Sequence, residues 1–318
     1  MGIFYSVRVE GLSGPFSVSA ILPENQINSE VTFFDIGLEP GDVQILEVLL
    51  ENYGDSEIIV MQEVNTAITN DNGIIDYTQA NAERDSTLLH SFSDIATFDE
   101  EIVLPARSSK TIQIEIDLPD ESFEGVILGG LRYQEKVAED YVSDVQIENQ
   151  FAFVLGLRIS VGDVENLEPD LQLNDIFPNQ RNYRNVLSVN LQNTEAVMIS
   201  ELTIDAKVFM LGHDEPIREV VSDNLRMAPN SNFNFPISWE YQPFEDGNYI
   251  LEMTVTAVDR EWNFRREFTI DNSDELNEIA ILEEIEQEIN MLFLAIIAGL
   301  MGIVLGVIFS NYAKKKSK

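Results

Sequence analysis

The stretch TIQIEIDL, residues Thr111–Leu118, alternates apolar and polar side chains without a break. Successive side chains of a β-strand point to opposite faces of the sheet, so the four apolar residues of this stretch share one face. The stretch LEMTVTA, residues Leu251–Ala257, follows the same period of two. Both patterns predict half-buried strands with one face on a core and the other in water.

Similar short strands are predicted between Phe16 and Ile270, with no helical period before Asp274. The further predicted strands are Phe16–Ile21, Val31–Leu38, Val43–Asn52, Glu57–Val64, Gly125–Tyr133, Phe151–Ile159, Val186–Gln192, Leu202–Phe209, Glu219–Arg226, Phe233–Trp239 and Phe264–Ile270. Turn-forming sequences separate several of them, at Glu39–Asp42, Asn70–Gly73, Pro229–Asn232 and Glu245–Asn248. Short strands at this spacing predict an all-β chain of antiparallel sandwiches.

A polar segment that ends in proline, Gly162–Pro169, predicts a boundary between two immunoglobulin-like β-sandwich domains. The first domain is expected at residues 16–162, with its extra length in the loop Ile74–Thr97, and the second at residues 170–271. Pro236 lacks an N–H for a ladder hydrogen bond, so we expect its strand at an edge or a bulge.

A helical period begins at Asp274, where Ile281, Ile285, Ile289 and Leu292 form one apolar stripe among glutamates. This pattern predicts an acidic helical stalk over residues 274–290. The stripe would pack on a second copy of the chain or on the sandwich before it.

The segment MLFLAIIAGLMGIVLGVIF, Met291–Phe309, contains no charged or polar side chain. As a helix it would extend ~28 Å, close to the hydrocarbon thickness of a bilayer. We therefore predict a transmembrane helix at residues 291–310 in the lipid bilayer, in preference to a buried core helix. The lysine-rich tail at residues 311–318 is expected in the cytoplasm, which leaves the N-terminal portion of this single-pass cell-membrane protein outside the cell.

Two observations qualify and extend this topology. An outward orientation needs a secretory signal, but Arg8 and Glu10 interrupt the apolar part of the first twenty residues. We therefore expect a signal to lie upstream of this start. Within the span, Ala298, Gly302 and Gly306 recur every four residues, a spacing that lets two transmembrane helices pack closely, so they are candidates for self-association.

Composition excludes one class of partner. The formal net charge is −37, and the surface this implies repels polyphosphates, so we expect no nucleic acid as a partner and disfavour anionic wall polymers. The acidity serves solubility or salt adaptation, or it attracts cations and basic protein patches. The chain has no cysteine, and an outer surface without disulfides favours a Gram-positive bacterium.

No pattern predicts catalysis, a cofactor or a metal. The two histidines, His90 and His213, lie one in each expected domain without a second histidine or cysteine nearby, which does not form a zinc cluster. Asn70–Asp76 is rich in oxygen ligands, but its spacing does not fit a calcium loop, and Asn72-Gly73 predicts a tight hairpin turn instead. Trp239 continues an apolar strand face and is expected in the core, whereas Trp262 is expected in a polar turn.

Several segments in one order carry a family resemblance. They are Pro23–Gln26, Phe33–Asp35, Pro40-Gly41, Asn65–Asn70, Ile75–Tyr77, Phe92–Asp94, Phe123–Leu131, Pro169–Leu171, Leu191–Asn193, Met227–Phe233 and Phe235–Trp239. This order, followed by a predicted span and a lysine tail, resembles the WxL-interacting surface proteins of Gram-positive bacteria. The resemblance implies a peptidoglycan-binding domain followed by a host-binding domain, both sandwich-like.

The resemblance implies a membrane-anchored, non-enzymatic binding protein whose partners are WxL-domain surface proteins, peptidoglycan and host extracellular matrix. Sandwiches bind through loops and sheet edges, so the candidate partner contacts are Tyr77, Phe92, Phe123, Leu128 and Trp262. Two alternatives remain from the sequence: a strand-donating, chaperone-like module for surface assembly, and a wall hydrolase.

Overall fold

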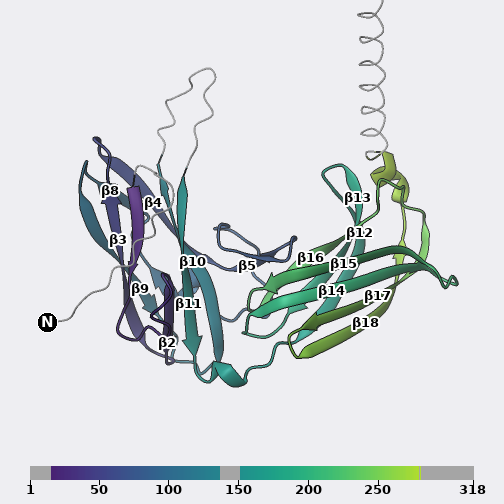
Figure 1. Cartoon of the computed structure of the whole chain (residues 1–318), viewed down its shortest axis with the longest axis horizontal. Helices are drawn as coiled ribbons and strands as arrows, with labels where there is room; N and C mark the ends of the chain where they lie inside the picture. Colours follow the sequence, from purple (N-terminus) through teal and green to yellow (C-terminus); the bar gives the residue numbers. More distant parts are fainter. Residues whose placement is uncertain (1–15, 137–150, 279, 281–318) are drawn as a thin grey trace, which may run out of the picture.

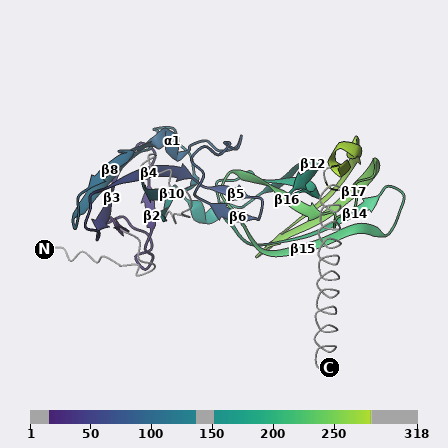
Figure 2. The same ribbon diagram turned by 90° about the horizontal axis from the view of Figure 1, so that it is seen from above.

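The computed structural model describes residues 16–136, 151–278 and 280. Its strands form two groups of sheets that lie side by side, with a small hairpin between them (Figures 1 and 2). We call these groups the first sandwich, strands β1–β4 and β7–β11, and the second sandwich, strands β12–β18. A short 3-10 helix, η1 (Val164–Asn166), lies on the connection between them.

The first sandwich has two sheets of four and five strands. The order of the four-stranded sheet is β1 (Phe16–Ile21), β3 (Val43–Asn52), β9 (Ser109–Asp117) and β7 (Ala96–Thr97). The order of the five-stranded sheet is β2 (Phe34–Leu38), β11 (Ala152–Val161), β10 (Gly125–Glu135), β4 (Ile58–Thr66) and β8 (Glu101–Leu104).

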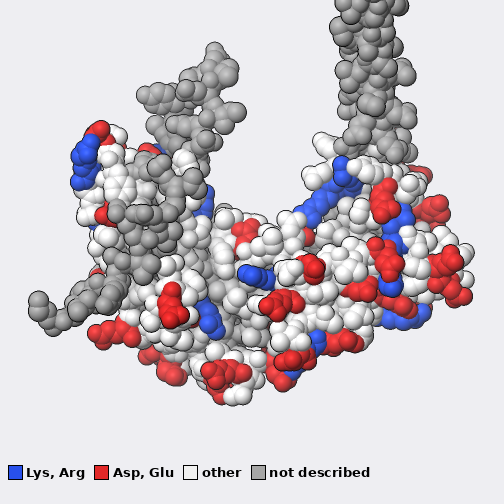
Figure 3. Space-filling model, in the orientation of Figure 1, with Lys and Arg blue, Asp and Glu red and all other residues white. Residues whose placement is uncertain are grey.

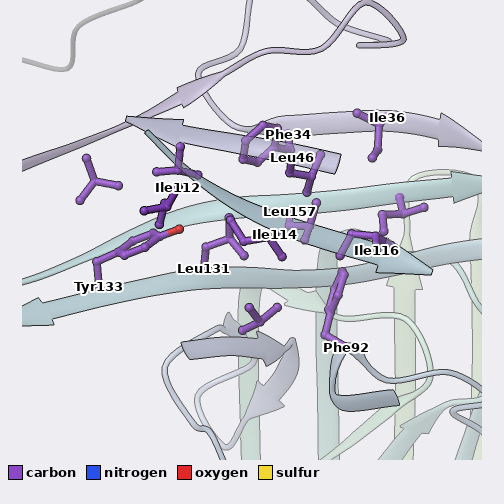
Figure 4. Packing of buried hydrophobic residues seen from close by; sticks show 14 of the residues in the cluster. Phe34, Ile36, Leu46, Phe92, Ile112, Ile114, Ile116, Leu131, Tyr133 and Leu157 are labelled. Carbon is purple, nitrogen blue, oxygen red and sulfur yellow. The ribbon is translucent and has the colours of Figure 1, made fainter. Parts of the chain in front are cut away.

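The alternating stretch Thr111–Leu118 buries one face and exposes the other, as predicted. Ile112, Ile114 and Ile116 are buried in the core between the two sheets, whereas Gln113 and Glu115 are exposed (Figure 4). Residues of both sheets supply this core, including Leu46 from β3 and Leu157 from β11 (Figure 4). Apolar burial of this kind is the main source of stability in a chain without disulfides.

One pairing corrects the expectation of purely antiparallel sheets. β2 pairs with β11 in parallel, from Phe34 opposite Leu157 to Leu38 opposite Val161. The two strands are far apart in sequence, so no hairpin constrains their direction. The other pairings among the described strands are antiparallel.

The second sandwich has seven strands in two sheets. The three-stranded sheet is β12 (Leu171–Arg181), β13 (Arg184–Asn193) and β16 (Ser231–Ser238). The four-stranded sheet is β15 (Pro216–Met227), β14 (Ile199–Met210), β17 (Gly247–Ala257) and β18 (Arg260–Ile270). Trp239 is 3% exposed in the core, as predicted, and Pro236 lies on β16, which is an edge strand as predicted.

The predicted loop Ile74–Thr97 holds more structure than expected. It contains β6 (Ile74–Asp76), which pairs with β5 (Ile68–Asn70), and a four-residue helix, α1 (Phe92–Ile95), before β7. The hairpin turn predicted at Asn72-Gly73 is confirmed, but only Gly73 has a positive φ, of 66°. The hairpin loop therefore has three residues, 71–73, with Gly73 in the left-handed conformation. It is not a two-residue turn, in which both Asn72 and Gly73 would have a positive φ.

Residues 273–278 are helical, at the start of the predicted stalk. The rest of the stalk, the predicted span 291–310 and its residues Ala298, Gly302 and Gly306 lie outside the described residues. Among the residues that are described, no helix is long and apolar enough to cross a membrane.

Candidate binding groove between the two sandwiches

An apolar seam joins the two sandwiches. Ala67, Val126 and Leu128 contribute to it from the side of the first sandwich, and Ala228 contributes from the second sandwich. Tyr77 is half-buried and packs against this cluster. Hydrogen bonds around this seam also join the two sandwiches, among them one of 2.7 Å from Val126 N to Ala196 O.

The β5–β6 hairpin covers open edges of the second sandwich. Gly73 O accepts a hydrogen bond of 2.8 Å from Arg226 N at the end of β15, and Thr69 Oγ1 accepts one of 3.0 Å from Ala228 N. Asp71 Oδ1 accepts a hydrogen bond of 3.2 Å from Asn234 N on the edge strand β16. The hairpin thus takes up backbone donors that an open sheet edge would leave free.

A groove of about 1330 Å³ lies at this junction. One side is built by β5, the turn of the β5–β6 hairpin and the segment that follows Asp76, and the other side by β12, β13 and β16. This volume exceeds the ~300–1,000 Å³ typical of a small-molecule pocket, so the groove has room for a segment of a polymer.

Side-chain amides form the floor of the groove, on the outer face of the three-stranded sheet. The five are Asn174 on β12, Asn190 and Gln192 on β13, and Asn232 and Asn234 on β16. They bond to one another across the strands: Asn174 Nδ2 donates to the side-chain oxygens of Asn190 and Gln192 at 3.0 Å, and Asn190 Nδ2 donates to those of Asn232 and Asn234 at 3.0 Å. The network fixes the amides on a flat, uncharged surface.

Asp85 joins this floor to the first sandwich. Its side chain is 7% exposed and accepts hydrogen bonds from Gln192 Nε2 at 2.8 Å and Asn232 Nδ2 at 2.5 Å. Thr87 also donates to it, from its backbone N at 2.8 Å and its hydroxyl at 2.7 Å. Burial raises the pKa of Asp85, but the hydrogen bonds from Asn232, Thr87 and Gln192 outweigh it, so the pKa lies below its ordinary value.

Carboxylates outnumber cations around the groove. The acidic lining residues are Asp71, Asp76, Glu83, Asp85 and Asp175, against Arg84 and Arg181. Arg84 is engaged, because Nη1 lies 2.8 Å from Asp94 Oδ2 and Nε donates to Leu88 O at 3.0 Å. Acidic side chains are also spread over the visible face of both sandwiches (Figure 3). The groove therefore disfavours anionic ligands.

Two carboxylates of the groove, Asp76 and Asp85, have pKa values below the ordinary one. Burial raises the pKa of Asp76, but its hydrogen bonds from Thr78 and Gln79 outweigh burial and the pKa is lowered, as for Asp85. A glycosidase needs one carboxylic acid with a raised pKa. Within the described ranges no group of three or more His, Cys, Asp or Glu residues is placed to hold a metal ion. The imidazole of His90 lies 4.6 Å from the Phe123 ring, centroid to centroid.

The five predicted contact residues do not form one site. Tyr77 and Leu128 belong to the apolar seam, and Phe92, with no exposed surface, belongs to the core of the first sandwich. Phe123 is half-buried against that core. These positions give Phe92 and Leu128 a packing role, while contact by Tyr77 and Phe123 stays a prediction.

Trp262 lies in strand β18 and not in the expected turn. The turn between β17 and β18 is shorter than predicted, because Trp262 already pairs with Val255. Its indole Nε1 donates to Asp170 Oδ1 at 3.3 Å, and the ring packs against the core of the second sandwich. A partner contact by Trp262 stays a prediction.

The floor residues were missed from the sequence. Asn190 and Gln192 alternate with Val189 and Leu191 in a predicted strand, so the sequence pattern predicts that their side chains point away from the core. Their function was not, because polar residues on an outer strand face usually contact water alone. Only the position of the first sandwich over this face turns it into a groove.

Comparison with protein families decides the relationship. Residues 16–135 match the peptidoglycan binding domain of the WxL Interacting Protein family, and residues 142–278 match its host binding domain. The chain belongs to the WxL Interacting Protein family. The resemblance noted in the sequence is thereby confirmed, with the two domains in the expected order. In the family's terms, the floor of the groove belongs to the host binding domain, and Asp85 and the hairpin belong to the peptidoglycan binding domain.

Similarity to solved structures is much weaker. A chaperone–tip adhesin complex of CFA/I fimbriae is 13% identical over 81% of this chain and 99% of that one, with a TM-score of 0.32. The CsuC–CsuE pre-assembly complex of Acinetobacter baumannii is 14% identical over 70% and 91%, with a TM-score of 0.33, and the E. coli chaperone DraB is 11% identical over 78% and 98%, with a TM-score of 0.29. At these values the similarity carries no argument about function. No curated protein sequence matches the chain.

Proposed function

We propose that this protein is a non-enzymatic binding protein of a Gram-positive cell surface. It engages peptidoglycan, WxL-domain wall proteins and host extracellular matrix by contact alone. The observation that carries the proposal is the tandem of family domains, a peptidoglycan binding domain followed by a host binding domain, which together build one polar groove.

The predicted transmembrane helix would locate this binding activity at the cell membrane. Residues 291–310 would hold the protein in the cell membrane with residues 16–271 outside, as two domains at 16–162 and 170–271 on the stalk 274–290. The apolar sequence of the span and its lysine tail support this arrangement. Close packing through Ala298, Gly302 and Gly306 would bring two copies together on the surface.

The two alternatives find less support. A glycosidase uses one carboxylic acid with a raised pKa, and two of the five carboxylates that line the groove, Asp76 and Asp85, have lowered pKa values. A strand-donating chaperone requires an open edge, and the β5–β6 hairpin already covers part of two edge strands, β15 and β16.

The test uses the full-length protein in a mild detergent with purified peptidoglycan. We expect the protein to sediment with the peptidoglycan and to release no soluble sugar fragments. A pull-down with a WxL-domain protein should give a complex that survives washing. Release of fragments would overturn the binding proposal in favour of a hydrolase, and a protein that stays in the supernatant in both assays would overturn it outright.

Protease treatment of intact cells tests the topology separately. We expect the N-terminal portion to be removed and the C-terminal tail to be protected. An N-terminal portion that resists protease on intact cells but not on lysed cells would contradict an outward orientation.

A further inference from the structure

Resting on the proposed function, we propose that the amide floor of the groove binds an uncharged glycan segment that bears hydroxyl and N-acetyl groups, and that both domains share this site. The family description separates a peptidoglycan binding domain from a host binding domain. The structure instead puts the recognition surface on the host binding domain and its wall on the peptidoglycan binding domain.

The chemistry of the floor favours groups that donate hydrogen bonds to neutral acceptors. The side chains of Asn174, Asn190, Gln192, Asn232 and Asn234 carry no charge. Their network uses both amide N–H groups of Asn174 and of Asn190, but each of the five side-chain oxygens keeps at least one lone pair for a ligand donor. Neighbouring strands lie ~4.8 Å apart and alternate residues of a strand ~6.6 Å apart, so the floor is a regular grid. Sugar hydroxyls and acetamido groups match such a grid along the length of a chain.

Charge excludes the other polymers of a bacterial wall. The lining has five carboxylates against two arginines, and Arg84 is paired with Asp94 while Arg181 Nη2 donates to Asn72 Oδ1 at 3.1 Å. A phosphate or polycarboxylate chain would meet five carboxylates, and among the lining cations only Arg181 has no carboxylate partner in the described residues. A neutral chain avoids this penalty.

The edge of the floor argues against an extended peptide. A peptide strand binds a sheet by adding to its edge, through backbone hydrogen bonds. On β16 the donor of Asn234 is taken by Asp71, and Pro236 has no N–H. The edge next to the groove is therefore closed to a strand, and only the side-chain face is offered.

The fixed geometry of the groove makes binding by preorganised groups possible. Asp85 holds Gln192 and Asn232 from the first sandwich, and Thr69 Oγ1 lies 2.6 Å from Ser231 Oγ in a buried position. A ligand then meets amides that are already oriented, which lowers the entropic cost of binding. Separation of the sandwiches would remove the wall of the site and release these amides.

Calorimetric titration of the full-length protein in detergent tests this inference with three probes. They are a hexamer of β-1,4-linked N-acetylglucosamine, oligoglutamate and oligolysine. We expect only the neutral hexamer to bind with an affinity that stays within about twofold when ionic strength rises from about 50 mM to about 500 mM, since no charge pair is involved. Salt-sensitive binding of oligolysine alone would overturn the proposal in favour of a basic peptide, and absence of binding by the hexamer would overturn it too.

Two groove variants and one control locate the site. Asn190→Leu removes the central amide, and Asn174→Ala removes a peripheral one, and we expect each to weaken hexamer binding about tenfold or more, an amount typical of one or two lost hydrogen bonds. Asn263→Ala, on the exposed face of the other sheet, should leave binding unchanged. Melting temperatures show that each variant is folded. Undiminished binding by both folded groove variants would overturn the site.

The same variants separate this inference from the proposed function. Wild-type protein and Asn190→Leu retained equally on whole peptidoglycan would refute the groove as the site while leaving surface binding intact. Wild-type protein that peptidoglycan does not retain would refute peptidoglycan binding itself.

Discussion

The side chain of Asp85 joins segments of the two family domains. Its carboxylate is buried and accepts four hydrogen bonds, two of them from β13 and β16 of the second sandwich. Asp85→Ala leaves these donors without an acceptor in a buried place, so we expect the free energy of unfolding to fall by about 2–4 kcal/mol. Chemical denaturation of the full-length protein measures this change.

An exposed aspartate supplies the control for this variant. Asp259→Ala, in the turn before β18, should change the free energy of unfolding by less than about 0.5 kcal/mol. If Asp85→Ala had an effect as small as Asp259→Ala, the buried carboxylate would not hold the junction together.

Acid should weaken the same connection. Because hydrogen bonds keep the pKa of folded Asp85 below the ordinary 3.8, the unfolded chain binds a proton first as the pH falls, and stability falls with it. The stability difference between the wild-type protein and Asp85→Asn should be full near about pH 6 and should shrink as the pH drops below about 3.8. Melting temperatures of both proteins across this range measure it, and a difference that grows on acidification would contradict the assignment.

Among the structural elements, strands were predictable wherever one face is buried. Val43–Asn52 was predicted with its observed bounds, and the isoleucines of Thr111–Leu118 lie in the core, because period two follows directly from strand geometry. β12 was not predicted as a strand. Its sequence LQLNDIFPNQR contains a proline, and its pairing with β13 shifts register between Leu173 and Ile176, so its side chains do not follow one unbroken period of two. The parallel pairing of β2 with β11 and the groove both depend on contacts between distant segments, which a local pattern does not contain.

Gly125, at the start of β10, tests how closely the two sandwiches approach. It has φ of 149°, and a Cβ there would lie 2.3 Å from the Cβ of Ala196. Its neighbour Val126 N donates to Ala196 O at 2.7 Å, so the strand start cannot move away without losing this bond. We expect Gly125→Ala to lower the free energy of unfolding by more than about 2 kcal/mol, as overpacking and backbone strain add.

Gly212 is a matched control for Gly125, because it also has a positive φ, of 90°, but no atom within 4 Å of the added Cβ. Gly212→Ala should therefore cost only the backbone strain, about 1 kcal/mol. Denaturation curves of the two variants give the comparison, and equal losses would show that the approach to Ala196 is not tight.

The molecule as a whole should unfold as one unit. The apolar seam, the β5–β6 hairpin and Asp85 each join the two sandwiches, and none of these contacts survives if one sandwich unfolds alone. Differential scanning calorimetry of the full-length protein should show a single transition for the sandwiches, and Gly125→Ala should split or broaden it. Two well-separated transitions in the wild-type protein would mean that the domains are independent.

Retention on purified peptidoglycan, measured for the wild-type protein, Gly125→Ala and Gly212→Ala, tests most directly whether the two domains bind as one surface. Circular dichroism first establishes that all three are folded at the assay temperature. We expect the wild-type protein and Gly212→Ala to stay bound without release of sugar fragments, whereas Gly125→Ala washes off. Equal retention of all three folded proteins, or fragments released by any of them, would contradict this expectation.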